Sequence, residues 1–219
     1  MSESSRNVLD DVRRSLGRTR TSLVPPTPPP IPDLVARLVH SPIGLPELFA
    51  KRASDLKMLV EPVRVDELTG KMADFLRGRN CKTIMLSDTP LLRKLEIGDA
   101  LDEAGFAARY WSGVTADGAY DYDAGVTDVD YAVAETGTLV IRHRPGHGRL
   151  LSLVPFVHVA VVEPKVFLPD LIDLFDVLAK EGVGSGVTMI SGPSKTADIE
   201  MNVVTGVHGP NVVKAFVLE

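Results

Sequence analysis

The fold is decided by residues 82 to 111, which read KTIMLSDTPLLRKLEIGDALDEAGFAARYW. The first six residues, KTIMLS, include the apolar run of residues 84 to 86 and predict a buried strand. Pro90 then favours the start of a helix whose leucines recur at helical spacing, and Gly105 favours its end. The last residues, 108 to 111, have the pattern of another strand. This order predicts a strand–helix–strand unit.

The chain from about residue 45 onward continues this alternation. Amphipathic helices are predicted within residues 46 to 59, 66 to 79 and 166 to 182, and further strands at residues 129 to 134, 138 to 142, 156 to 162, 186 to 191 and 212 to 218. Because these strands are almost continuously apolar, we expect both faces of the sheet to be buried. The predicted fold class is α/β, with a mainly parallel sheet sandwiched by helices. The polar residues 117 to 125 are predicted to form a loop.

The first 40 residues differ from the rest. Val8, Val12 and Leu16 are spaced for a short amphipathic helix, and PPTPPPIP at residues 25 to 32 favours an extended polyproline conformation. We therefore expect a helical arm and a proline-rich linker at residues 1 to 40, followed by a single α/β domain at residues 41 to 219. A partly disordered N-terminus is the alternative interpretation.

Composition excludes several classes of protein. The chain has 219 residues, 44% hydrophobic and 24% charged, which is typical of a soluble globular domain. A net charge of −5 argues against nucleic acid as a partner. The sequence contains no run of about 20 apolar residues, so it predicts no membrane span. The lone Cys81 cannot form an internal disulfide or hold an iron–sulfur cluster by itself, and together these features suggest the cytosol.

The first candidate motif is AETGTLVI at residues 134 to 141. Glu135, Thr136, Gly137 and Thr138 lie between two predicted strands, and strand ends are where α/β folds bind ligands. Glu135 can act there as a nucleophile, a base or a hydrogen-bond acceptor, so we treat it as a candidate catalytic residue. The alternative is a tight turn in which the glycine supplies a positive φ and the hydroxyls satisfy backbone groups.

The second motif is SGPSKTADIE at residues 191 to 200, directly after a predicted strand. A helix beginning near Lys195 or Thr196, with Ser194 as its N-cap, would present backbone N–H groups to a phosphate or carboxylate. Asp198 and Glu200 would repel such an anion, and simple capping without a ligand is the alternative. The candidate ligand-binding residues of this motif are Ser191, Gly192, Ser194, Lys195, Thr196 and Asp198.

The third motif is GVHGP at residues 206 to 210, where two glycines and a proline hold His208 on a constrained turn. His208 is therefore a candidate proton carrier or ligand contact, although most histidines in loops are neither. His143 and His147 are four residues apart, but Pro145 and Gly146 between them disfavour a helical zinc site. We expect no metal in this chain.

In order and spacing, YAVAETGTLVI, GRLLSLVPFVHVAVVE, ISGPSKTADIE and GVHGP resemble the lactate utilization protein C family, whose fold unit is called the LUD domain. The resemblance covers roughly residues 45 to 219. It implies a fold like that of the superfamily of glucosamine-6-phosphate deaminase, ribose-5-phosphate isomerase and CoA transferase. It also implies a role in the oxidation of L-lactate to pyruvate with two partner proteins, at least one of which carries iron–sulfur clusters.

The resemblance and the cysteine count together predict an accessory subunit. The chain has no set of cluster ligands and no recognisable dinucleotide loop, so we expect no cofactor in it and the redox centres on partners. The working hypothesis is a pocket of Glu135, Thr136, Thr138, Ser191, Ser194 and His208 that binds a small carboxylate, acyl or nucleotide group. The alternatives are a free-standing transferase or ligase that uses Glu135 as its nucleophile, and a structural partner without a ligand.

Overall fold

The computed structural model describes residues 3–17, 44–196, 204–205 and 208–219. The chain divides into two compact units, Met1–Ala36 and Arg37–Glu219. In the first unit, helix α1 (Glu3–Ser15) exposes Val8 and Val12, and Leu16 in the turn that follows is also exposed, in line with the amphipathic pattern. The segment PPTPPPIP lies outside the described residues. The predicted division of the chain at residue 40 stays a prediction.

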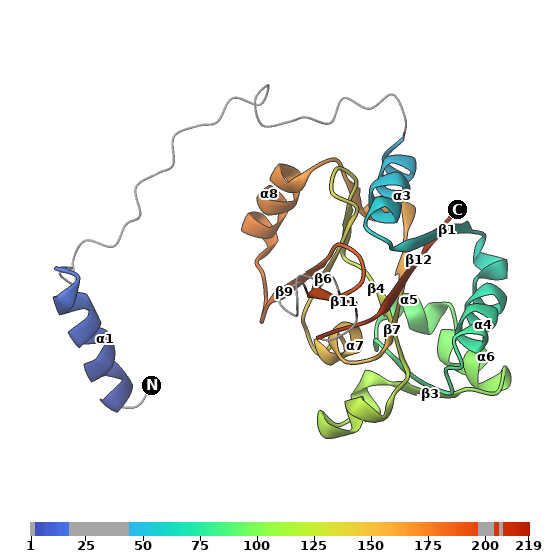
Figure 1. Cartoon of the computed structure of the whole chain (residues 1–219), viewed down its shortest axis with the longest axis horizontal. Coiled ribbons are helices and arrows are strands. Elements are labelled where there is room, and N and C mark those ends of the chain that lie inside the picture. Colours follow the sequence, from blue (N-terminus) through green and yellow to red (C-terminus); the bar gives the residue numbers. More distant parts are fainter. Residues whose placement is uncertain (1–2, 18–43, 197–203, 206–207) are drawn as a thin grey trace. The chain divides into compact units, whose positions relative to one another are not determined.

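A parallel sheet of six described strands forms the centre of the second unit (Figure 1). Its strand order is β1-β12-β7-β4-β2-β3, and every neighbouring pair is parallel. The strands are β1 (Leu59–Val63), β2 (Thr83–Leu86), β3 (Ala107–Tyr110), β4 (Ala124–Asp128), β7 (Val157–Val162) and β12 (Val212–Leu218). This sheet and its flanking helices confirm the predicted α/β class.

The helices of this unit agree with the helical periodicity of the sequence. They are α3 (Leu45–Asp55), α4 (Leu68–Gly78), α5 (Pro90–Lys94), α6 (Ile97–Glu103), α7 (Leu150–Leu153) and α8 (Leu171–Glu181), with short 3₁₀ turns η1 (Val65–Glu67), η2 (Trp111–Gly113), η3 (Asp117–Asp121) and η4 (Pro164–Val166). The helix expected after Pro90 is divided into α5 and α6, because Glu96 adopts a left-handed backbone with φ 51°. The prediction of a loop at residues 117 to 125 was wrong in part, since these residues include η3 and the start of β4.

A second sheet was not separated from the first by the sequence pattern. It comprises β5 (Tyr131–Val133), β6 (Thr138–Arg142), β8 (Phe167–Leu168) and β9 (Val187–Ile190), in the order β8-β5-β6-β9. The pairs β5–β6 and β6–β9 are antiparallel. The short connection between β5 and β6 leaves no room for a crossover helix, so these strands form a hairpin.

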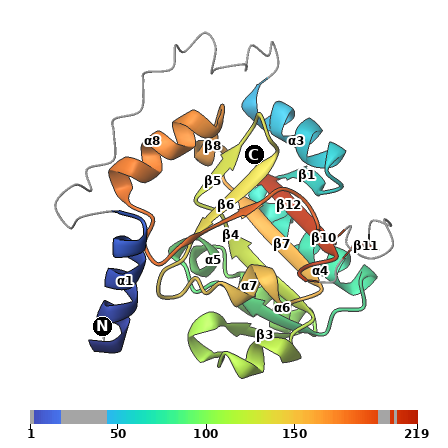
Figure 2. The ribbon, with the colours of Figure 1, turned by 60° about the vertical axis from the view of Figure 1, so that its left-hand side comes forward.

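The second sheet lies between the parallel sheet and α8. One face of the parallel sheet packs against α4, α5 and α6 through one hydrophobic core. Its other face packs against α3 and the second sheet through a second core, and α8 covers the far side of the second sheet. Figures 1 and 2 show this succession, with α4 and α6 on one side and α8 on the other. The sandwich therefore has a sheet in place of helices over part of one face.

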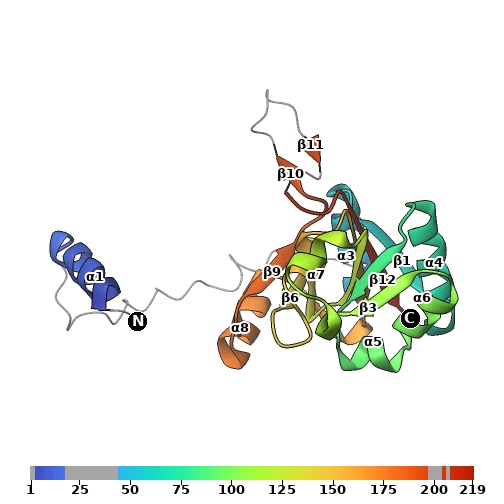
Figure 3. The same cartoon turned by 90° about the horizontal axis from the view of Figure 1, so that it is seen from below.

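A small antiparallel ribbon replaces the helix that was expected after Ser194. Strands β10 (Lys195–Thr196) and β11 (Val204–Thr205) pair with each other, and Figure 3 shows them projecting from the body of the unit. The expectation of a helix beginning near Lys195 or Thr196 was therefore wrong. The β-branched residues Thr196, Val204 and Thr205 favour the extended conformation over a helix.

Gly125 allows a close contact between layers, which leads to a stability prediction. A Cβ atom added at Gly125 in β4 would overlap the carbonyl oxygen of Leu151 in α7. We expect Gly125→Ala to lower the free energy of unfolding by about 3 kcal/mol, because the backbone must move. Urea denaturation followed by circular dichroism measures this change. Gly78→Ala is the control, since an added Cβ there meets no atom within 4 Å, and an equal loss in both variants would contradict the prediction.

Candidate functional site

The ETGT motif forms the turn between β5 and β6. Gly137 has φ +61°, and an added Cβ would overlap the backbone of Arg52 and Ala53 in α3, so only glycine fits there. The N–H of Glu135 donates to the carbonyl of Pro169 at 3.0 Å. The turn is thus fixed from two sides, and the side chain of Glu135 is partly exposed.

Two of the candidate motifs meet through a row of hydroxyl groups. Thr136 Oγ1 lies 2.7 Å from Thr138 Oγ1, which in turn lies 2.7 Å from Ser191 Oγ. The pairing of Leu139 in β6 with Ile190 in β9 brings Thr138 beside Ser191. We call Thr136, Thr138 and Ser191 the hydroxyl cluster. Three O–H groups make these two short bonds. The remaining proton can be donated either to the carbonyl oxygen of Thr136, 3.5 Å from Thr138 Oγ1, or to a ligand.

The residues after Ser191 pack against the turn that follows α3. Gly192 has φ +95°, and a Cβ there would overlap the carbonyl oxygen of Leu56. Lys195 Nζ donates to the same carbonyl at 3.2 Å. The N–H of Ser194 donates to the carbonyl of Pro210 at 2.9 Å. Since β10 follows, Ser194 caps no helix, and the proposed helix N-terminus for an anion is absent from the described residues.

The other predicted site residues make no described hydrogen bond with the hydroxyl cluster through their side chains. His208 is exposed, and the neighbouring Gly209 lies beside Ser194. Among the described residues, no hydrogen bond or ion pair joins the side chain of Glu135 or His208 to the hydroxyl cluster. Thr196 lies in β10 and its side chain is not described, while Asp198 lies outside the described residues.

These motifs lie at the amino ends of the parallel strands. Leu56, which contacts Gly192 and Lys195, comes shortly before β1, and the N–H of Asn211, next to β12, donates to the carbonyl of Phe156, next to β7. Ligands of open α/β sheets usually bind at the carboxyl ends instead. The hydroxyl cluster therefore lies at an uncommon location for a ligand site. The opposite edge, at the carboxyl ends of the strands, is the usual location.

The carboxyl edge holds a buried polar group that the sequence reasoning missed. The strand order reverses between β2 and β4, because the chain runs from β2 outward to β3 and then back to β4. At this point Ser87 Oγ and Thr89 Oγ1 donate to Asp128 Oδ1 at 2.9 and 3.0 Å. His147 Nδ1 lies 3.8 Å from the same oxygen. We call Ser87, Thr89, Asp128 and His147 the Asp128 cluster.

The loop HRPGHGR at residues 143 to 149 crosses this edge and carries His147 inward. The N–H of Asp88 donates to the carbonyl of Gly146 at 2.7 Å, and Cβ atoms at Gly146 and Gly148 would overlap Asp88 and Trp111. The two glycines therefore allow the loop to close over His147. The glycines on both sides of this histidine were the signal in the sequence, but the sequence interpretation used only Pro145 and Gly146, as evidence against a helical zinc site.

Three of the described histidines, His143, His147 and His158, are buried, and burial lowers the pKa of each. Both ring nitrogens of His147 and Nδ1 of His158 have no hydrogen-bond partner among the described residues, while His158 Nε2 lies 2.9 Å from Thr127 Oγ1. Burial lowers the pKa of His147 from 6.5 to about 4, although the Asp128 carboxylate opposes the shift. Burial likewise lowers the pKa of His158 to about 3. Neither His147 nor His158 carries a charge at neutral pH.

The two edges differ in access and charge. Thr136 and Glu135 are partly exposed, and Ser191 and Lys195 are exposed, whereas every member of the Asp128 cluster is buried. Ser87 and Thr89 direct their protons at Asp128, whose charge repels a second anion. Among the described residues, no group of three His, Cys, Asp or Glu side chains is placed to hold a metal ion.

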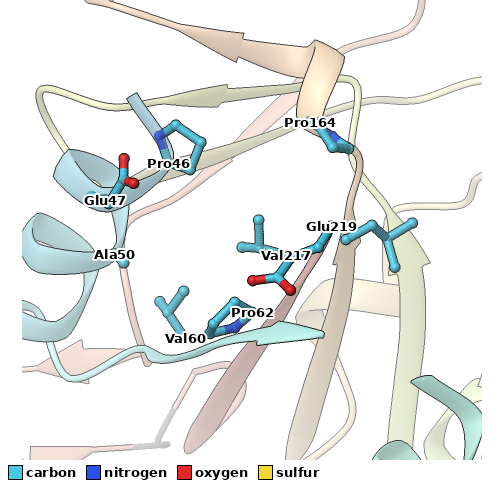
Figure 4. Close-up of a pocket in the computed structure, with 9 residues that line it drawn as sticks. Pro46, Glu47, Ala50, Val60, Pro62, Pro164, Val217 and Glu219 are labelled. Carbon is cyan, nitrogen blue, oxygen red and sulfur yellow. The ribbon is translucent and has the colours of Figure 1, made fainter. Parts of the chain in front are cut away.

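A separate apolar groove of about 400 Å³ lies at the carboxyl ends of β1 and β12, and Figure 4 shows the residues around it. Its lining consists of Pro46, Glu47, Ala50, Val60, Pro62, Pro164, Val217, Leu218 and Glu219. None of the predicted site residues lines this groove.

A model of the LUD domain family matches residues 47–218, which include the hydroxyl cluster and the Asp128 cluster. The chain belongs to the LUD domain family. This membership confirms the family suggested by the four motifs. Within the part of this LUD protein that the structure describes, no helix is both long and apolar enough to cross a membrane.

Several relatives of this LUD domain carry the name Lactate utilization protein C. The Deinococcus radiodurans protein is 31% identical over 220 residues, 99% of this chain and 96% of that protein. The Halalkalibacterium halodurans protein is 27% identical over 213 residues, 92% of each. The Exiguobacterium protein is 44% identical over 93 residues, and this match spans only 40% of each protein.

A solved structure also resembles this LUD domain. The crystal structure of a DUF162 family protein from Deinococcus radiodurans has a TM-score of 0.60 and 23% sequence identity, and the match covers 81% of this chain and 100% of that chain. The likeness shows a shared fold.

The buried histidines predict how stability depends on pH. In the folded protein the side chains of His147 and His158 stay neutral, whereas in the unfolded chain they become protonated when the pH falls below their ordinary pKa of 6.5. The free energy of unfolding should therefore be constant above about pH 6.5 and fall by about 1.4 kcal/mol per pH unit for each histidine on acidification to the folded-state pKa.

Urea denaturation at pH 7.5, 6.0 and 5.0 measures this dependence. His158→Gln should give a shallower slope, because one buried titrating group is removed. His208→Gln is the control and should leave the slope unchanged, because its side chain is exposed. Equal slopes in the parent chain and in His158→Gln would refute the assignment.

Proposed function

We propose that this chain is a subunit of a system that oxidises L-lactate to pyruvate. The observation that carries the proposal is the match to relatives named Lactate utilization protein C over nearly the full chain, 99% and 92% in two of them. Membership of the LUD domain family across residues 47–218 supports it.

The redox centres belong, in this proposal, to partner subunits with iron–sulfur clusters. Oxidation of lactate to pyruvate releases two electrons, and clusters are usually held by four cysteine thiolates. This chain has one cysteine, Cys81, and burial raises the pKa of its thiol to about 11. A thiol with so high a pKa is a poor metal ligand or nucleophile, because both roles need the thiolate.

The role of this subunit is to hold a small carboxylate at the hydroxyl cluster. The hydroxyl cluster can offer a ligand the one proton that is otherwise held by the 3.5 Å contact of Thr138 Oγ1 with the Thr136 carbonyl. Lys195 adds a positive charge near Gly192, because its Nζ donates to the Leu56 carbonyl that Gly192 also faces. Glu135 stands on the same turn and can accept the hydroxyl proton of a hydroxy acid in a hydrogen bond. The Asp128 cluster is less suitable for an anion, because it is closed and negatively charged.

Growth on lactate tests the role in the cell. A bacterium whose own homologue has been deleted should regain growth on L-lactate when it expresses this chain, while growth on pyruvate stays unchanged throughout. Affinity purification of the expressed chain should retain partners that contain iron and acid-labile sulfide. Restored growth on lactate without any iron in the purified complex would contradict the assignment of the redox centres, and no restoration would contradict the role itself.

Titration calorimetry tests the ligand site. L-Lactate or pyruvate should bind the reconstituted complex, and Thr138→Val should weaken binding about tenfold, because it removes one hydroxyl from the row. Thr89→Val is the matched control, since it removes a buried hydroxyl at the opposite edge of the sheet. Loss of binding in Thr89→Val but not in Thr138→Val would place the ligand at the Asp128 cluster and overturn this proposal.

A further inference from the structure

A second groove, of about 570 Å³, lies at the amino ends of β1 and β12. Its walls are the end of α3, the turn before β1, the last turns of α4 and the start of β12. Its lining combines three cations with an apolar floor and one hydroxyl: Lys57, Arg79, Lys214, Met58, Leu59, Val60, Phe75 and Ser54. We call it the cationic groove. Among the residues that the structure describes, no carboxylate lines it, although the whole chain has a net charge of −5.

One cation of this groove is built into the fold. Lys214 is only 8% exposed, and its Nζ donates to Glu61 Oε2 at 2.6 Å. Its ammonium group also lies 4.8 Å from the ring centroid of Phe216 and 5.5 Å from that of Phe75. A buried lysine is costly to desolvate, and the carboxylate with the two rings offsets that cost. The positive charge is therefore held in place at the floor of the groove.

The other two cations have no carboxylate partner among the described residues. Arg79 stands with its guanidinium 5.5 Å from the ring centroid of Phe75, and no salt bridge of the described residues includes Arg79 or Lys57. Glu61 is already shared between Lys214 and Lys71. The neighbouring Arg77, in contrast, is paired with Asp74 at 2.9 Å. The groove therefore keeps two positive charges available for a ligand.

We propose that the cationic groove binds a nucleotide, that is, a ligand with a phosphate group and a planar ring. The fork of Arg79 and the ammonium of Lys57 match phosphate oxygens, whereas the charge of Lys214 is already paired with Glu61. Leu59, which is 40% exposed, and the partly exposed Phe75 form the apolar surface that receives the ring. The volume of about 570 Å³ is within the range of small-ligand sites.

This site goes beyond the proposed role in lactate oxidation and does not depend on it. It shares only the turn at Leu56 and Lys57 with the residues near the hydroxyl cluster. If the chain binds a nucleotide but not lactate, the nucleotide proposal stands and the lactate proposal fails. Binding of lactate without a nucleotide has the opposite meaning.

Isothermal titration of the full chain with ADP tests the proposal. ADP should bind, adenosine and pyrophosphate alone should each bind at least tenfold more weakly, and affinity should fall as salt is raised, because charges contribute to binding. Arg79→Gln and Lys57→Gln should each weaken ADP binding about tenfold, the effect of losing one charge-assisted contact.

Arg77→Gln is the matched control. It removes a cation from the same helix, but from outside the groove, and should leave ADP affinity unchanged. Thermal unfolding would show that each variant is folded. No heat of binding with millimolar ADP, or an equal loss of affinity in Arg77→Gln and Arg79→Gln, would overturn the proposal. Equal affinity for pyrophosphate and ADP would also overturn it, since the apolar floor would then have no role.

Discussion

The double burial of strand β7 is the constraint on which the other layers depend. All six of its residues are buried. Val157, Val159 and Val161 pack into the core formed with α4, α5 and α6, whereas Ala160 and Val162 pack into the core shared with α3 and the second sheet. Each buried valine stabilises the fold by roughly 1.5–3 kcal/mol, so both layers must be in place. The polar exception, His158, stays neutral and is matched by Thr127.

Much of this architecture could be predicted from the sequence, because the signals are local. Pro90, Gly105 and the leucine spacing between them identify helices, and continuous apolar runs identify buried strands. The second sheet could not be separated from the first, because an apolar run does not tell which strand it pairs with. The ribbon of β10 and β11 was missed for a related reason. Pro193 and Ser194 fit a helix start as well as a turn, and the pairing of Lys195 and Thr196 with Thr205 and Val204 decides between them.

The candidate site was predicted only where its residues share a turn or a register. Thr136 and Thr138 are two residues apart, but the contact of Thr138 with Ser191 depends on the register of β6 with β9. The Asp128 cluster draws on two strand ends and on a distant loop, so no single stretch of sequence indicated it. His147 shows the limit most clearly, since the way the loop closes leaves its ring nitrogens without a hydrogen-bond partner among the described residues.

The two edges of the parallel sheet support different chemistry because their charges are arranged differently. At the carboxyl edge, hydroxyl protons point at one buried carboxylate, so the donors are already used and an anion would meet a like charge. At the amino edge, one proton of the hydroxyl cluster is held only by the 3.5 Å contact of Thr138 Oγ1 with the Thr136 carbonyl, and Lys57, Arg79 and Lys195 lie around the same turn. A small anion loses less hydration at this open edge than in a sealed crevice. The charge arrangement therefore favours the amino edge, even though most α/β folds bind their ligands at the other end.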